Sequence, residues 1–256
     1  MKQLTPLLIL FMFIAVPLSA DLFYQMDITT QTMGITVTTT QRTYIQGDKM
    51  RQETWLKLPE SMQPPTTPTT QITITRLDKR VLWQLNELTK TYKETPLTAL
   101  LSQTTPLAES LFKHMDLDIQ NLGPDTVHTY PCTKLQLTLT FKQLPPSLQQ
   151  TFDKLQLTLW IGQPPGWQEY SSFYDKYRSL TGTSNWQPLL GTSLDPSIQR
   201  KLDAATKDIQ GMPLKLHTAI YSQNTILSSL DGELVQLSTD KLSPSLFELP
   251  PGYQKE

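Results

Sequence analysis

The sequence is poor in the residues on which several classes of protein depend. It contains one cysteine, Cys132, and ten glycines among its 256 residues. A single cysteine cannot form an internal disulfide, so the fold has to be held together by packing. Only 18% of the residues are charged and the formal net charge is −1, without a basic cluster. This composition lacks the electrostatic footprint of nucleic-acid-binding proteins, and we expect no nucleic-acid partner.

The motifs of common enzymes are also missing. The sequence has no G-x-S-x-G elbow, no P-loop and no dinucleotide-binding glycine pattern. The three histidines, His114, His128 and His217, have no histidine or cysteine neighbour at metal-ligand spacing. Asp116 and Asp118 would suit glycoside hydrolysis only if they faced a cleft. We therefore expect no catalytic residue, no metal and no cofactor, and we keep a hydrolase only as a third hypothesis.

Cys132 has two interpretations. As a nucleophile it would need a base, and His128 lies on the same strand parity. As a residue near the start of a strand it is more often a small, packed side chain. We favour the structural interpretation.

The first twenty residues have the organisation of a secretory signal. Lys2 supplies a positive charge, Leu7 to Val16 are all apolar, and a small-residue cleavage site precedes Asp21. The apolar run is shorter than the roughly 20 residues that span a bilayer, although a retained anchor is the alternative. Asp21 stands where bacterial lipoproteins carry their lipidated cysteine. We expect residues 1–20 to be removed and residues 21–256 to form one periplasmic or secreted domain without a transmembrane segment.

Strands with one dry and one wet face dominate the rest of the chain. The hexapeptide KLQLTL occurs twice, beginning at Lys134 and at Lys154. In each copy the leucines alternate with Gln, Thr or Lys, which is typical of antiparallel strands that bury one face. Similar alternation predicts roughly ten or eleven strands. Their expected turns are at Gln46–Asp48, at Asp78-Lys79 and at Asp231-Gly232.

Helical segments fall between groups of strands. Thr95–Met115 predicts one or two helices, with a second start at Thr105 and Pro106. Gly166–Leu180 is a helix rich in aromatic residues, and Asp195–Gly211 is a helix with an apolar stripe. The proline-rich segment Pro59–Thr70 predicts a long extended loop. These helices need an apolar surface, and the dry face of a curved sheet would provide one.

Four segments resemble a bacterial exported domain family of unknown function. In chain order they are YIQGDKMRQE, ITRLDKRVLWQLNELTKTYKETP, GPDTVHTYPCTKLQLTL and LFELPPGYQKE. The family is similar to the superfamily of periplasmic lipoprotein carriers, which have the lipoprotein-localisation-factor fold. The resemblance covers most of the chain from Leu22 to Tyr253. It implies an α+β fold: a curved, unclosed antiparallel β half-barrel with helices lying across its concave face. In the carriers, that apolar hollow takes up acyl chains.

The first functional hypothesis is a non-enzymatic periplasmic protein that binds an acyl chain, a lipid or another apolar ligand, including a lipoprotein acyl chain, in this hollow. Its expected lining comprises the dry-face leucines and an aromatic set that would act as a lid: Leu135, Leu137, Leu139, Leu155, Leu157, Leu159, Trp83, Trp167, Tyr170, Phe173, Tyr174 and Tyr177. The aromatic residues also suit ordinary packing on the sheet. The second hypothesis is a cell-envelope interaction module whose helices fill the hollow. In that case a strand edge or the Pro59–Thr70 loop binds a protein partner.

Overall fold

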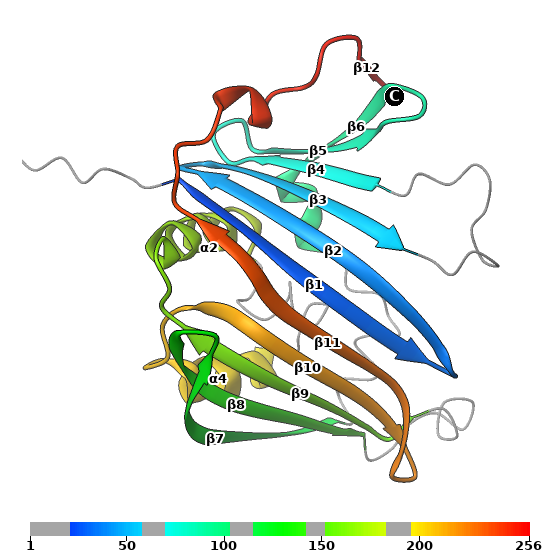
Figure 1. Cartoon of the computed structure of the whole chain (residues 1–256), viewed down its shortest axis with the longest axis vertical. Coiled ribbons are helices and arrows are strands. Elements are labelled where there is room, and N and C mark those ends of the chain that lie inside the picture. The colour runs from blue at the N-terminus through cyan, green and yellow to red at the C-terminus, as the bar shows by residue number, and fades with distance from the viewer. Residues whose placement is uncertain (1–20, 58–69, 103–114, 142–151, 183–195) are drawn as a thin grey trace, which may run out of the picture.

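The computed structural model describes residues 21–57, 70–102, 115–141, 152–182 and 196–256. Residues 1–20, which were expected to be a signal segment, therefore lie outside the described residues. So do residues 59–69 of the expected loop and the expected helix at Thr105. Most of the described residues form one sheet of twelve strands in the order β12-β6-β5-β4-β3-β2-β1-β11-β10-β9-β8-β7 (Figure 1). In this part of the chain β7 and β12 are unjoined edges, so the sheet stays open.

The N-terminal half of the sheet is a meander of six antiparallel strands. These are β1 (Leu22–Thr32), β2 (Ile35–Gln46), β3 (Lys49–Lys57), β4 (Thr70–Arg76), β5 (Val81–Asn86) and β6 (Thr91–Pro96). A 3-10 helix, η2 (Leu97–Ser102), follows β6. The last strand of the chain, β12 (Gln254–Lys255), pairs in parallel with β6 and is the one parallel neighbour in the described sheet.

The other half of the sheet is built from five antiparallel strands. These are β7 (Met115–Val127), β8 (Tyr130–Phe141), β9 (Lys154–Gly162), β10 (Met212–Ser222) and β11 (Thr225–Ser238). Two helices, α2 (Trp167–Thr181) and α4 (Pro196–Thr206), connect β9 to β10, and a short 3-10 helix, η3 (Pro244–Phe247), follows β11. The pairing of β11 with β1 joins the two halves.

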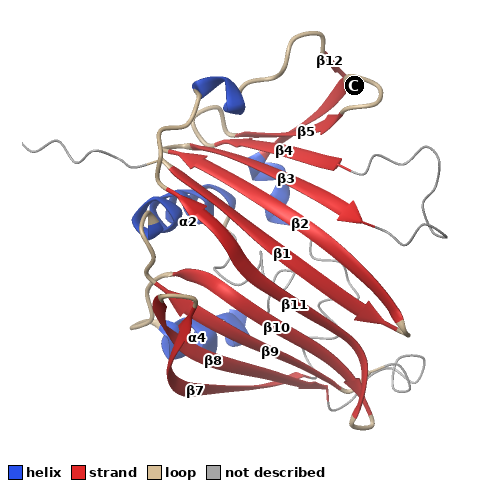
Figure 2. Ribbon diagram, in the orientation of Figure 1, coloured by secondary structure: helices blue, strands red, loops and turns tan. Residues whose placement is uncertain are grey.

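Both α-helices lie on the same face of the curved sheet (Figure 2). Helix α2 packs against Leu22 and Tyr24 of β1, and Leu202 of α4 packs against leucines of β8 and β9. The expected fold, an unclosed antiparallel half-barrel with helices across its concave face, is confirmed. We call the helix-covered side of the sheet the inner face and the opposite side the outer face.

The prediction of a turn at Asp231-Gly232 is wrong. Both residues lie inside β11, where Gly232 pairs with Ile28 on one side and with Leu216 on the other. A Cβ atom on Gly232 would stand 3.1 Å from Cγ of Leu216 and 3.5 Å from Cγ1 of Ile28. The glycine therefore makes room for two inner-face side chains and does not reverse the chain. As a result, the two strands expected here form one long strand.

Strand β7 differs from the expectation of a helix that continues as far as Met115. Met115, Leu117 and Ile119 alternate with exposed polar residues, which is the pattern of a strand with one dry face. Leu117 pairs with Leu139, and Ile119 pairs with Leu137. The Asp116 and Asp118 carboxylates consequently belong to the outer face of an edge strand.

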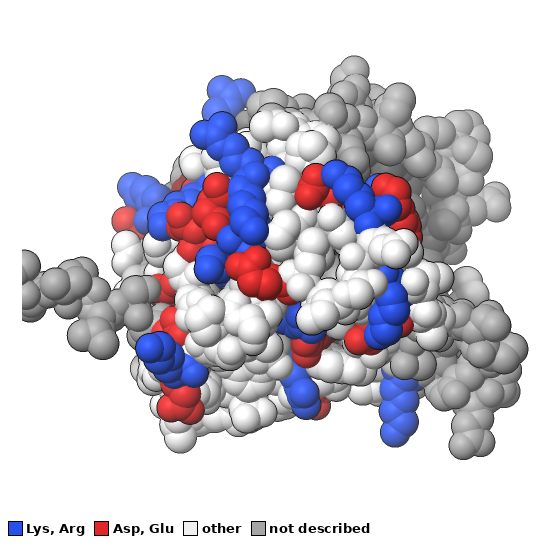
Figure 3. Space-filling view, turned by 90° about the horizontal axis from the view of Figure 1, so that it is seen from above, with Lys and Arg blue, Asp and Glu red and all other residues white. Residues whose placement is uncertain are grey.

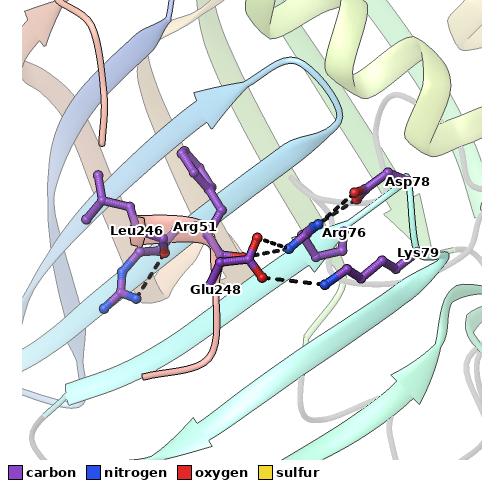
Figure 4. A network of polar contacts seen from close by, with 7 residues as sticks. Arg51, Arg76, Asp78, Lys79, Leu246 and Glu248 are labelled. Carbon is purple, nitrogen blue, oxygen red and sulfur yellow. Dashed lines mark hydrogen bonds and ion pairs between the residues drawn. The ribbon is translucent and has the colours of Figure 1, made fainter. Parts of the chain in front are cut away.

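The outer face of β3 to β6 is covered by the C-terminal segment Ser243–Glu256, which we call the C-terminal strap. Phe247 of the strap is fully buried, and Leu249 and Tyr253 pack against a cluster formed by Ile72, Ile74, Trp83 and Leu85. Polar contacts fix the strap to the sheet (Figure 4). Arg76 binds the backbone oxygen of Phe247 and the carboxylate of Glu248, and Arg51 binds the backbone oxygen of Leu246.

Seen from the β6 end of the sheet, the surface carries lysine and arginine side chains interspersed with acidic side chains (Figure 3).

Candidate ligand-binding face

The strand register divides the side chains of the sheet by polarity. One continuous row of paired residues on the inner face runs Leu135, Leu159, Leu216, Gly232, Ile28 and Thr39. The neighbouring outer row runs Lys134, Trp160, Lys215, Glu233, Asp27 and Thr40. Applied to every described residue of β1–β5 and β7–β11, this register places the charged side chains on the outer face and none on the inner face.

Helix α4 covers the leucine-rich part of the inner face. Leu202 is fully buried and packs into a cluster with the twin-strand leucines that were predicted to line the hollow. Four of those leucines are at most 1% exposed: Leu135, Leu137, Leu157 and Leu159. Leu139 is also buried, whereas Leu155 is half-buried at the margin of the cluster. The twin strands thus lie side by side and point their leucines toward α4.

Helix α2 covers the inner face where β1, β2 and β3 begin or end. Phe173 is 1% exposed, and the Tyr170 ring meets the rings of Tyr24 and Tyr174 at centroid distances of 6.2 and 4.5 Å. The Tyr174 hydroxyl donates to Sδ of Met50 at 3.8 Å. Burial raises the pKa of Tyr24, Tyr170 and Tyr174 above the ordinary value for a phenol. These phenols are therefore neutral hydrogen-bonding groups in a dry setting.

Polar contacts hold α2 against the β2–β3 turn. The backbone N–H of Gly47 donates to Oε1 of Glu169 at 2.6 Å, and Nζ of Lys176 lies 2.6 Å from Oδ1 of Asp48. The helix begins after Gly166 and ends before Gly182, and both glycines adopt the left-handed conformation that favours glycine. These contacts fix the aromatic residues of α2 over β1 to β3.

Between the two helices, the inner face carries half-buried apolar side chains interspersed with threonines such as Thr30 and Thr218. We call this surface the central strip and define it by Ile28, Leu155, Leu216 and Leu230, each of which has intermediate exposure. Leu216 packs against the clusters of both helices, so it marks the boundary between them. Ile28 and Leu216 were not among the predicted lining residues. The sequence shows that each of these residues alternates with polar neighbours. Only the strand register shows that Ile28 and Leu216 lie close together on the inner face.

The aromatic residues of the predicted site do not all lie together. Trp167, Tyr170, Phe173, Tyr174 and Tyr177 all pack in the α2 cluster. Trp83 does not join them, because it lies on the outer face and packs against the C-terminal strap. Its indole N–H donates to Oε2 of Glu94 at 2.9 Å. The expectation that Trp83 lines the hollow is therefore corrected: its strand is dry on the outer face because the strap covers it.

Two of the candidate reactive side chains, Cys132 and His128, lie in the described residues. The described residues contain no group of three or more His, Cys, Asp or Glu side chains that could hold a metal. Cys132 is buried, and burial together with the nearby Asp125 carboxylate raises the pKa of its thiol, which disfavours the thiolate. His128 instead approaches the backbone oxygen of Leu234 at 2.7 Å. In the same part of the chain, no helix is long and apolar enough to cross a membrane.

The solved structures that resemble this fold have low sequence identity to this chain and low TM-scores. An uncharacterized conserved protein from Thermus thermophilus is 12% identical, with 93% of this chain and 91% of that chain covered and a TM-score of 0.40. The lipoprotein LppX of Mycobacterium tuberculosis is 8% identical, with 86% and 88% covered and a TM-score of 0.37. A LolA superfamily protein from Nitrosomonas europaea is 12% identical, with 90% of both chains covered and a TM-score of 0.31. The likeness of this chain to these three structures is loose.

Sequence comparison gives a firmer assignment. No curated protein sequence matches the chain. A family model described as "Domain of unknown function (DUF4412)" matches residues 24–161, which is more than half of the chain and runs from β1 to β9. The matched segment contains the twin leucine strands and the N-terminal meander, whereas α2, α4, β10 and β11 follow it. The chain belongs to the DUF4412 family.

Proposed function

We propose that this protein is a non-enzymatic binding protein of the cell envelope that holds an apolar chain, such as the acyl chain of a lipid or lipoprotein, along the central strip. One observation carries the proposal: the strip is uncharged and apolar although it is only half-buried. Apolar side chains that stay partly exposed near one another are typical of ligand or partner surfaces. The expected signal segment at residues 1–20 supports a periplasmic or secreted location.

Burial alone would supply useful affinity. Each CH₂ group that leaves water contributes about 0.8 kcal/mol, so a chain of about twelve carbons offers roughly 9 kcal/mol before the costs of association. That amount is consistent with a dissociation constant in the micromolar range or weaker. Helices α2 and α4 would flank the bound chain and shield it from water.

One observation favours a second candidate function. The leucines beneath α4 are already fully buried, so this part of the inner face is filled by the protein's own helix. A filled face is what the interaction-module hypothesis expects, with a strand edge binding a protein partner. The two candidates differ in whether the central strip is a binding surface.

The test uses fluorescence of the uncharged probe N-phenyl-1-naphthylamine, together with native mass spectrometry of protein purified from cells. Leu230→Arg places a charge on the strip, and Ser229→Arg places the same charge on the next residue of β11, which faces outward. We expect the Leu230 variant to lose probe binding and co-purifying lipid, while the Ser229 variant keeps both. If the wild-type protein binds neither probe nor lipid, the binding function is refuted and the filled-core alternative stands.

A further inference from the structure

The inner face has a second kind of uncharged surface, next to the central strip. On β2, β3 and β4 it carries threonine and glutamine instead of leucine. Tyr24, Thr43, Gln52 and Thr73 pair in one row across β1 to β4. In the next row, Met26 is followed by Gln41, Thr54 and Gln71. We call Gln41, Thr43, Gln52, Thr54 and Thr73 the Thr/Gln patch.

One group in this patch lacks a hydrogen-bond partner. Thr43 is fully buried, and its Oγ1 atom has no partner in hydrogen-bonding geometry. The nearest candidate partner is the Tyr24 hydroxyl: burial raises the pKa of Tyr24, and hydrogen bonding toward Thr43 and toward Tyr174 of α2 partly offsets that rise. A buried hydroxyl without a partner is costly and is usually satisfied by a water or a ligand. The other members of the patch are half-buried, so they are open to a ligand at its margin.

The patch and the strip are continuous across β1. Met26 and Ile28 stand between the Thr/Gln patch on β2 and the leucines of β10 and β11. Together they form one uncharged surface with an apolar end and an end of hydroxyl and amide groups. A charged headgroup on the patch would be desolvated without a counter-ion, which is strongly unfavourable. Hydroxyl and carbonyl groups, in contrast, would find both donors and acceptors there.

We propose that the ligand is an uncharged amphiphile, an acyl ester of a polyol such as glycerol, whose headgroup is held by the Thr/Gln patch while its chain lies along the central strip. This inference rests on the proposed function and adds the chemical class of the headgroup. Discrimination against an ionised headgroup comes from the absence of a charged side chain on this face of β1 to β5; the row that carries Thr43, Gln52 and Thr73 reaches its first charge at Lys93 of β6, two strands beyond Thr73. Recognition of the neutral headgroup comes from Gln52, Thr43 and their neighbours.

The experiment compares three twelve-carbon ligands by displacement of N-phenyl-1-naphthylamine at pH 8: 1-monolauroylglycerol, laurate and lauroyl-lysophosphatidylglycerol. We expect monolauroylglycerol to bind at least about tenfold more tightly than either anion. The double variant Thr43→Val/Gln52→Leu should lose about tenfold in affinity for monolauroylglycerol, because each lost hydrogen bond costs about three- to tenfold. Its affinity for the apolar probe should not change.

Controls separate recognition from folding and from the proposed function. Thr38→Val makes the same change on the outer face of β2 and should leave all affinities unchanged. Thr43→Val alone removes the unpartnered hydroxyl, so it should not lower the thermal midpoint. Equal binding of laurate and monolauroylglycerol, or an unchanged affinity in the double variant, would overturn the headgroup assignment and leave apolar binding intact. Failure of the wild-type protein to bind even the apolar probe would refute both.

Discussion

At the scale of single residues, Arg76 is a junction whose guanidinium makes four hydrogen bonds. It is 4% exposed, and its guanidinium makes a two-pronged contact with Asp78 at 2.8 and 2.7 Å. It also donates to Glu248 at 2.7 Å and to the Phe247 backbone oxygen at 3.1 Å. A planar group with several fixed donors is suited to such a junction, whereas a lysine could not reproduce the geometry.

We expect Arg76→Met to lower the free energy of unfolding by about 2 kcal/mol, because it leaves the Phe247 oxygen and two carboxylates without their donor. This expected loss is smaller than the loss for a fully buried ion pair, because the Asp78 and Glu248 side chains are 36% and 48% exposed. Lys79→Met is the matched control. Lys79 contacts the same Glu248 at 3.4 Å but is itself 46% exposed, so its loss should cost less than about 0.5 kcal/mol. Urea titration of both variants measures this, and equal losses would contradict the prediction.

The same junction predicts an acid-sensitive contribution to stability. The hydrogen bond from Arg76 lowers the pKa of Asp78. Burial raises the pKa of Glu248, but the Arg76 hydrogen bond and the Arg76 and Lys79 charges outweigh it, so the net shift is downward. A depressed pKa in the folded state stabilises the protein above the unfolded pKa of about 4, and this stabilisation is lost as the pH falls further. The stability difference between the wild-type protein and Arg76→Met should therefore be constant from pH 5 to 7 and shrink below about pH 4. A difference that grows toward acid pH would contradict this.

At the scale of elements, β11 depends on a glycine in an unusual place. Gly232 sits mid-strand between Leu216 and Ile28, and a larger side chain would displace both. We expect Gly232→Val to lower the free energy of unfolding by about 1 to 3 kcal/mol through overpacking. Ser229→Val, on the outer face of the same strand, should change it by no more than about 0.5 kcal/mol. Thermal unfolding of the two variants measures this; a neutral Gly232→Val would show that the inner face has room to adjust.

Local patterns predicted some elements well and others poorly. Helix α2 was expected at Gly166–Leu180 and is found at Trp167–Thr181, because glycines at both ends and an aromatic stripe mark it locally. Strand β7 carries an equally clear alternation, yet its first residue was expected to end a helix. Period-two patterning over Met115, Leu117 and Ile119 should have outweighed that helical interpretation.

At the scale of the whole molecule, the C-terminal strap performs two separable tasks. Its residues 244–253 cover the outer cluster around Trp83, and β12 occupies part of the β6 edge. Removing residues 254–256 should expose only the edge and favour self-association, because an unpaired edge strand is a template for pairing. Removing residues 243–256 should also expose the apolar cluster and lower stability markedly. Size-exclusion chromatography and thermal unfolding distinguish the two; a fully stable monomer after the longer deletion would contradict this role.

The separation of charge onto the outer face predicts how binding responds to salt. Charges that do not face the ligand cannot contribute a screened attraction, so ionic strength should have little influence. We expect the affinity for an uncharged amphiphile to change less than about twofold between 0.05 and 0.5 M NaCl. Titration at both concentrations measures this, and a tenfold loss at high salt would show that ionic contacts hold the ligand.

Alternation along each strand is a local property, so the amino-acid sequence by itself determined the wet and dry faces of β8 and β9, the aromatic composition of α2 and the uncharged character of the leucine rows. Pairing between distant strands is not local. It decided that Gly232 lies between Leu216 and Ile28, and that Trp83 faces the strap and not the hollow. It also decided that threonine and glutamine of β2 to β4 share a surface with the leucines of β10 and β11. The physical reason is that the identity of a face depends on which residues pack against it, and those residues come from elsewhere in the chain.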